Sequence, residues 1–387
     1  MKHFKNLMKY GLVGLMTFST LTNAGEIQGI DLSYITTDED PYVQEETYFS
    51  TIFTDINKIT SNGSISWVES DVMAPGFSIV NFDEENGSNC FMTSGINPHD
   101  QSIKQCSDPF QSSKRIKLNS NKAGSEVDLV FDVSGNMGAT NTYRILEKYL
   151  NVTGFTMSDI TIELGFGTSD AFIPAAANIG LDFSDETGNI WIVDTVTGDT
   201  NSKNLDALFP FGLFGDDDTD PNHDIDGYFD SNNRARFILS ANRGIIKSTG
   251  ISANYKSLVG DFLSKSQVFD GIFYDFDNDE ETESATIAHL TDFGWVSFRS
   301  DQFWIDIGLP APSLNLDGSI LESTIDAWLA DPLFESGPIE DLANLNLNYH
   351  LSVGDISQWP TYDMNTLSAQ FTLRVSSISV IFKNGFE

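Results

Sequence analysis

Short apolar runs, separated by Gly, Asn, Asp and Ser, follow one another along most of this chain. The runs are rich in Val, Ile, Phe, Trp and Tyr, which are enriched in β-strands, while the separating residues favour turns. Because regular helices do not separate these runs, the pattern predicts an all-β fold, either an antiparallel β-sandwich or a jelly-roll-like arrangement. Clear examples lie at 64–68, 127–133, 160–165, 189–193, 235–239, 271–276, 294–298, 303–307 and 371–382.

One helix is predicted late in the chain. Ser319 and Glu322 have the S-x-x-E spacing of a capping box. Apolar residues then recur at helical spacing as far as Asp331-Pro332, a pair that ends a helix. A second short helical turn is expected at 338–342, because proline favours the first position of a helix. The fold should therefore contain one or two short late helices.

Residues 25–387 are predicted to form one large domain. A chain of about 360 residues can bury a large core. The sequence has no repeat with a period of 20–50 residues, which argues against a solenoid or a propeller. The polar stretch 198–204 is a weak candidate for a domain boundary.

Residues 1–24 have the pattern of a secretory signal peptide. Three lysines precede an apolar stretch from residue 10 to residue 21, and Thr22 and Ala24 occupy the positions before a cleavage site. The alternative is an N-terminal anchor helix, for which the stretch is short. No apolar run of membrane length follows it. The protein is therefore expected to be secreted, with the cell surface as a further possible location.

The predicted mature region is strongly acidic. It carries 18 basic and 56 acidic residues, a formal charge of −38. Such a surface repels nucleic acid and anionic lipid, which makes both poor partners. The acidity does not indicate disorder, because 40% of the chain is hydrophobic and 29 residues are Phe. The expected partner is an extracellular glycan or a matrix component.

Seven aspartates fall within fifteen residues, from 216 to 230. No Lys or Arg lies between Lys203 and Arg234 to balance them. Two unit charges 4 Å apart repel by about 1 kcal/mol in water and by more when partly desolvated, and cations that prefer oxygen ligands relieve this repulsion. The alternative is a solvated acidic loop. The spacing predicts Ca²⁺ ligands at Asp216, Asp218, Asp220, Asp224, Asp226 and Asp230.

A second acidic group is predicted to bind calcium more weakly. It consists of Asp275, Asp277 and Asp279. The Asp-x-Asp-x-Asp spacing suits a calcium turn, although Glu280 stands where glycine would permit the sharp bend. A solvated acidic face is an equal alternative.

The chain has two cysteines, Cys90 and Cys106, which are predicted to form a disulfide. In an oxidising compartment an isolated pair most simply forms a bond. Closing the 15-residue loop would stabilise the fold by about 3 kcal/mol. The alternative is a thiol nucleophile.

Catalytic signatures are scarce. The chain has no H-E-x-x-H, G-x-S-x-G or phosphate-binding loop, and no two of the four histidines after the signal peptide are close in sequence. Asp132 and Ser134 begin a motif similar to a metal-ion-dependent adhesion site, but Asn136 replaces the second serine. A strand that ends in a turn is the favoured interpretation there. An acid pair for glycoside hydrolysis stays open, because such a pair is assembled in space.

Four stretches together resemble the choice-of-anchor F family of exported bacterial proteins: 107–115, 163–167, 214–227 and 339–348. The resemblance extends over roughly residues 60–380. Members of this family are named for their differing C-terminal sorting signals. The C-terminal residues of this chain lack both a membrane-length apolar segment and a basic cluster, which favours free secretion. The resemblance implies an exported protein and supplies no catalytic residues.

The sequence therefore predicts a secreted or cell-surface, noncatalytic β-sandwich module that is stabilised by calcium. It would act by binding or as an extracellular structural protein. The alternative is a secreted glycan-active hydrolase that uses an Asp/Glu pair. A cleft with two facing carboxyl groups about 5–10 Å apart would favour that alternative.

Overall fold

The computed structural model confirms the all-β prediction. Strands dominate the regular structure that it describes, and three α-helices lie among them. The predicted boundary at 198–204 and residues 1–22 of the predicted signal peptide lie outside the described residues. The structure describes residues 23–36, 47–68, 76–81, 90–92, 117–120, 124, 126–137, 140–185, 187–192, 206–210, 212–215, 227–230, 234–276, 278 and 284–379.

Sixteen strands form the main sheet. They are β1 (Asn23–Ile30), β2 (Thr47–Phe53), β3 (Ser61–Val68), β4 (Gly76–Asn81), β5 (Cys90–Met92), β6 (Lys117–Ser120), β7 (Glu126–Met137), β8 (Asn141–Asn151), β9 (Met157–Phe166), β10 (Ile173–Pro174), β11 (Leu181–Ser184), β12 (Asp206–Leu208), β13 (Arg236–Asn242), β14 (Ile245–Ile251), β19 (Asn344–Val353) and β20 (Ser368–Ser379).

The order across the main sheet is β1-β7-β20-β9-β14-β13-β12-β19-β8-β6-β3-β2. Pairs along this order are antiparallel, except that β6 and β8 run parallel. Off this path, β10 pairs with β9, β11 with β19, and β4 with both β5 and β8. Strands distant in sequence are therefore neighbours, as β19 and β8 are over a ten-residue register.

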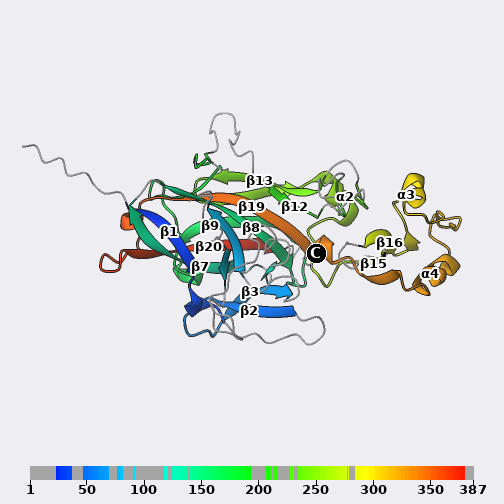
Figure 1. The fold of residues 1–387 in the computed structure, drawn as a ribbon, viewed down its shortest axis with the longest axis horizontal. Helices are drawn as coiled ribbons and strands as arrows, with labels where there is room; N and C mark the ends of the chain where they lie inside the picture. Colours follow the sequence, from blue (N-terminus) through cyan, green and yellow to red (C-terminus); the bar gives the residue numbers. More distant parts are fainter. Residues whose placement is uncertain are drawn as a thin grey trace, which may run out of the picture.

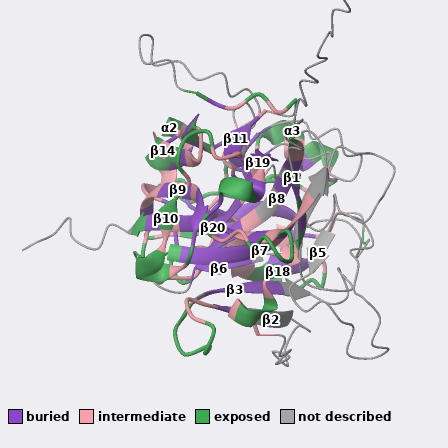
Figure 2. Cartoon of the chain, turned by 90° about the vertical axis from the view of Figure 1, so that its left-hand side faces the viewer, coloured by how far each residue is buried: buried purple, intermediate pink, exposed green. Residues whose placement is uncertain are grey.

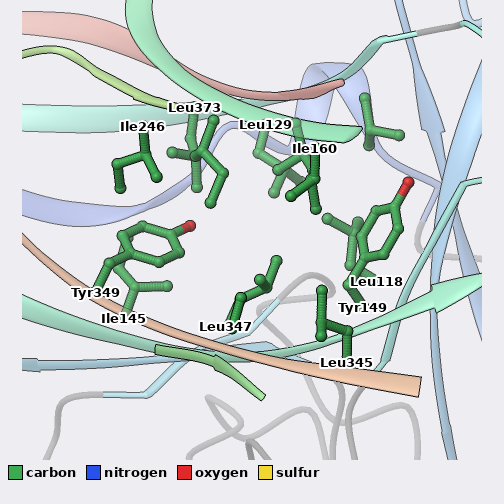
Figure 3. Packing of buried hydrophobic residues seen from close by; sticks show 14 of the residues in the cluster. Leu118, Leu129, Ile145, Tyr149, Ile160, Ile246, Leu345, Leu347, Tyr349 and Leu373 are labelled. Atoms are coloured by element: carbon green, nitrogen blue, oxygen red, sulfur yellow. The ribbon is translucent and has the colours of Figure 1, made fainter. Parts of the chain in front are cut away.

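The main sheet curls so that one part of it packs over another. Leu345 and Leu347 of β19 face Leu129 of β7, Ile160 of β9 and Leu373 of β20 across the core (Figure 3). These side chains are all buried, because alternate residues of each strand point into the same interior. Burying one such side chain completely stabilises the fold by about 1.5–3 kcal/mol. Figure 2 shows the buried residues gathered on the strands in the middle of the body.

Residues 270–338 form a separate small lobe with its own core. Its sheet has the order β17-β16-β15-β18, and Figure 1 shows these strands and two helices at one end of the long axis, beyond α2 (Ala253–Val259). The elements of the small lobe are β15 (Asp270–Tyr274), β16 (Ala285–Thr291), β17 (Gly294–Val296), α3 (Asp301–Asp306), α4 (Glu322–Leu329) and β18 (Phe334–Pro338).

The core of the small lobe is built around stacked aromatic rings. Trp328 of α4 lies between Trp304 of α3 and Phe334 of β18, with ring centroids 5.8 Å from each. Ile272 and Ile287 of the sheet complete the same buried cluster. The sheet of the small lobe therefore packs one face against α3 and α4.

A buried ion pair links β7 to β20 in the main sheet. Arg374 donates from Nε to Oδ1 of Asp128 at 2.6 Å and from Nη2 to Oδ2 at 2.7 Å. The Ser169 backbone N–H donates to the same Oδ2 at 2.7 Å, and Arg374 Nη2 also donates to the Ser169 carbonyl at 2.9 Å. The guanidinium lies 3.9 Å from the ring centroid of Phe172. Both charges are thus compensated inside the fold.

The late helix is confirmed as α4, but the predicted capping box is wrong. The helix begins at Glu322 after Leu321, and no side chain caps it. Ser319 instead donates from its hydroxyl to Asp317 Oδ1 at 2.7 Å, because it belongs to the preceding turn. The expected turn at 338–342 is the 3₁₀ helix η3 (Glu340–Ala343). Further short 3₁₀ helices are η1 (Leu32–Tyr34), η2 (Ser169–Ala171) and η4 (Ile356–Gln358).

Two predicted strands are wrong. The run 303–307 lies largely in α3, where the hydroxyl of Ser300 accepts from the Phe303 backbone N–H at 3.2 Å and so caps the helix. A short run of β-favouring residues does not distinguish a strand from a buried helix. In the described part of 189–193, Ile190 forms an isolated bridge with Ser184 and no strand follows.

Candidate functional site

The residues on either side of the aspartate-rich segment lie close together in the structure. The Gly227 N–H donates to the Gly215 carbonyl at 2.9 Å, and the Phe229 N–H donates to the Leu213 carbonyl at 2.8 Å. A Cβ on Gly227 would lie 2.6 Å from the backbone nitrogen of Gly215. Only glycine permits that approach. The two ends of the segment are therefore held together at residues 215 and 227.

Directly after this point, Tyr228 and Phe229 enter an aromatic junction between the main body and the small lobe. Their partners are Phe269, His289 and Phe298. The His289 ring centroid lies 5.4 Å from that of Phe229, 5.2 Å from that of Phe269 and 5.0 Å from that of Phe298. The junction thus packs β16 of the small lobe against the segment that follows the aspartates.

A polar pair is buried inside this junction. The Tyr228 hydroxyl donates to the Val296 carbonyl at 3.1 Å and lies 2.7 Å from Nδ1 of His289. The tautomer of the His289 ring sets which of the two groups is the donor in this second contact. The Arg299 guanidinium lies 5.2 Å from the Tyr228 ring centroid and 4.1 Å from that of Phe303. Every partner is supplied by the junction itself, which makes this pair structural in character.

Burial sets the protonation of the pair. It lowers the pKa of the His289 imidazole from 6.5 to about 4, because a charged ring would lose its hydration. Burial also raises the pKa of the Tyr228 phenol, so the hydroxyl keeps its proton. Both groups are therefore neutral near pH 7.

Acid is expected to weaken the junction through His289. The unfolded chain takes up a proton near pH 6.5, whereas the folded chain takes it up only near pH 4. The contribution of His289 to the free energy of unfolding is therefore complete above pH 6.5 and decreases as the pH falls toward 4. At pH 4.5 the loss is about 2 kcal/mol. Denaturant unfolding of the wild type and of His289→Phe at pH 7 and pH 4.5 checks this. The variant should lose less stability than the wild type; an equal loss in both would assign the effect to other groups.

Two of the predicted calcium ligands, Asp230 and Asp275, lie among the described residues, and each accepts a hydrogen bond from within the protein. Asp230 Oδ2 accepts from Nδ2 of Asn254 at 3.4 Å, at the start of α2. Asp275 Oδ1 accepts from the Asn278 N–H at 2.8 Å and closes a turn in which Asn278 has a φ of 55°.

The calcium-binding prediction is therefore corrected. Across the described ranges, no three His, Cys, Asp or Glu side chains are grouped so that they could hold a metal ion. A run of carboxylates in sequence does not converge on one point unless the backbone turns around it. The remaining predicted ligands lie outside the described residues: Asp216, Asp218, Asp220, Asp224, Asp226, Asp277 and Asp279.

The disulfide prediction is corrected as well. No disulfide is present in the part of the chain that the structure describes, and Cys106 lies outside it. Cys90 begins β5, where its backbone partner across the antiparallel pair is Ser78 of β4.

The small lobe carries an exposed apolar surface that the sequence reasoning missed. Phe293, in the turn between β16 and β17, is 85% exposed, and Leu314 is 56% exposed. Leu290 and Leu316 are exposed as well. We call these four residues the tip. An aromatic residue in the Asp292-Phe293-Gly294 turn, where polar residues are usual, was the available signal.

Backbone contacts bring the parts of the tip together. Leu290 pairs with Trp295 across β16 and β17. The Trp295 carbonyl accepts from the Ile320 N–H at 2.7 Å, and Ile320 forms a bridge with Leu314. A Cβ on Gly294 would lie 3.5 Å from Cβ of Ser319, so the turn that carries Phe293 rests against the 315–319 turn.

A pair of carboxylates lies elsewhere, beside β1 and β7. Nε2 of Gln370 donates to Asp31 Oδ2 and to Asp132 Oδ1, both at 2.8 Å, so these oxygens are no more than about 5.6 Å apart. Burial raises the pKa of Asp132 and the charge of Asp31 adds to this, against the lowering effect of the Gln370 bond. Two carboxyl groups held close together are the arrangement that an acid pair for glycoside hydrolysis requires.

Comparisons with protein-family models, with curated proteins and with solved structures find no match to this chain. The resemblance to the choice-of-anchor F family thus stays a prediction. Within the described ranges, no helix is both long enough and apolar enough to cross a membrane.

Proposed function

We propose that this protein is an exported, noncatalytic β protein that acts by binding an extracellular partner through its small lobe. The observation that carries this proposal is the tip, where Phe293 and three leucines are exposed on or next to two adjoining turns. Exposed apolar residues gathered at one place on a soluble protein are characteristic of a site of association. The main sheet then serves as the support that holds the lobe.

The build of the small lobe supports a binding role. Its sheet is held between two sets of contacts, the aromatic junction on the side of the main body and the Trp304–Trp328–Phe334 stack beneath α3 and α4. The turns that carry the tip are thus attached to a packed core. A surface supported in this way loses little conformational entropy when a partner binds.

A second candidate function is glycoside hydrolysis, and the Asp31–Asp132 pair is the observation that favours it. The two oxygens lie within the distance, about 5–5.5 Å, at which retaining glycosidases hold their carboxyl groups or closer. The Gln370 amide occupies the space between them, where a sugar would have to enter. For this reason we place binding first.

One experiment separates the two functions. Mature protein, residues 25–387, is applied to an array of extracellular glycans and matrix proteins, and the bound glycans are assayed for newly formed reducing ends. The proposal expects retention on the array without release of reducing sugar. Release of reducing sugar that is abolished in Asp132→Asn would establish the hydrolase instead. Absence of retention on every component would overturn the binding proposal.

A further inference from the structure

We infer that the tip of the small lobe binds a cationic amphipathic protein segment, one that combines Lys or Arg with apolar side chains. This inference rests on the proposed function and specifies its partner. It is based on the tip and on the charge that surrounds it.

The apolar residues of the tip lie on or next to two turns whose backbones adjoin. Phe293 projects from the β16–β17 turn, and the 315–319 turn that adjoins it carries Leu316 and follows Leu314. Leu290 extends the surface along β16. Apolar side chains of a partner would displace water from these residues, which supplies the non-directional part of the affinity.

The small lobe that carries the tip is strongly acidic in composition. The small lobe contains fifteen Asp and Glu residues and a single basic residue, Arg299, a formal charge of −14. Asp292 is exposed next to Phe293. Asp317 lies in the neighbouring turn, where bonds from the hydroxyl and the backbone N–H of Ser319 lower the pKa of its carboxyl. The tip is therefore flanked by the carboxyl groups of Asp292 and Asp317.

Arg299 does not neutralise the tip. Its guanidinium lies over the rings of Tyr228 and Phe303 in the junction, and Nε donates to the Thr286 carbonyl at 2.8 Å. From residue 300 to residue 373 the sequence has no Lys or Arg. Complementary charge must therefore come from the partner.

The same charge disfavours other occupants. Nucleic acid and anionic lipid surfaces are repelled by a lobe of this charge. The exposed residues are Phe and Leu, which suit the apolar side chains of a protein. A cationic amphipathic segment satisfies both the apolar and the anionic parts of the surface, and opposite charge also increases the rate of association.

The test uses the full mature chain and two synthetic peptides. One peptide is an amphipathic helix of Lys and Leu, and the other replaces every Lys by Glu. Calorimetry should detect binding of the Lys/Leu peptide and at least about tenfold weaker binding of the Glu/Leu peptide. Raising the salt concentration from about 0.05 M to 0.5 M should weaken the first interaction several-fold, because it shortens the Debye length.

Variants locate the site. Phe293→Ser with Leu316→Ser should weaken binding of the Lys/Leu peptide at least about tenfold. The matched control, Phe155→Ser with Ile59→Ser, removes one exposed Phe and one exposed aliphatic residue from the main body and should leave binding unchanged. Asp317→Asn should weaken binding about threefold. Its control is Asp363→Asn, because Asp363 is a similarly exposed carboxylate that closes a turn in the main body.

Three outcomes would overturn the inference: equal binding of both peptides, equal binding by the tip variant and its control, and lack of any binding of the Lys/Leu peptide. None of these contradicts the proposed function if the wild type is retained on the array. If the tip variant is not retained on the array while the Phe155→Ser, Ile59→Ser control is retained, the result would support both the inference and the proposed function.

Discussion

Replacing Arg374 by Met is expected to lower the free energy of unfolding by about 3–5 kcal/mol. The substitution keeps most of the side-chain volume but leaves the Asp128 carboxylate buried without its two charged hydrogen bonds at 2.6 and 2.7 Å. The Ser169 carbonyl also loses its donor, and the ring of Phe172 loses the guanidinium over it. Urea unfolding monitored by far-ultraviolet circular dichroism measures the loss.

Two further variants control this result. Arg236→Met makes the same change at an exposed position of β13 and should alter stability by no more than about 0.5 kcal/mol. Asp128→Leu combined with Arg374→Met removes both charges and should recover a large part of the loss. A double variant as unstable as the single one would show that packing, and not the unpaired charge, determines the effect.

Replacing Trp328 by Ala is expected to remove about 3–5 kcal/mol from the stability of the small lobe. Trp328 is 7% exposed and stacks on Trp304 and Phe334, so its loss leaves a cavity that two other rings line. The lobe has its own buried cluster, separate from that of the main sheet. The lobe should therefore open while the main sheet stays folded.

Hydrogen exchange measured by mass spectrometry distinguishes local from global opening. In Trp328→Ala, peptides from 284–338 should exchange faster, and peptides from β19 and β20 should keep their protection. Leu329→Ala, in the same helix but 44% exposed, is the matched control and should have little effect. Equal deprotection of both parts would mean that the lobe and the sheet unfold as one unit.

Strands could be predicted from the sequence where a run of apolar residues is by itself sufficient to form them. The cores of β7, β9 and β20 were all visible as apolar runs, because a strand buried in a sheet needs little more than a suitable composition. The run 303–307 has a similar composition but folds mostly into α3, since Ser300 caps it and Trp304 packs inside the lobe. Tertiary packing decided this element, and the local pattern did not.

The candidate site was less predictable than the fold. Tyr228 and His289 are 61 residues apart and meet only because the small lobe packs against the segment after the aspartates. Asp31 and Asp132 are likewise joined by Gln370, which is more than two hundred residues away in sequence. The acidic runs were conspicuous in sequence, but charge density alone does not fix a coordination geometry. Contacts of this kind depend on topology, which a single sequence does not reveal.

The two ends of the small lobe lie side by side. Asp270 pairs with Pro338, and the Ile339 N–H donates to the Phe269 carbonyl at 3.0 Å. A chain that joined residue 269 to residue 339 by a tight turn would leave the path from α2 to β19 uninterrupted. Insertions with adjacent ends are the ones that a host domain tolerates best. The small lobe therefore has the connectivity of an inserted unit, which gene rearrangement or protein engineering could replace by another unit without changing the strand order of the main sheet.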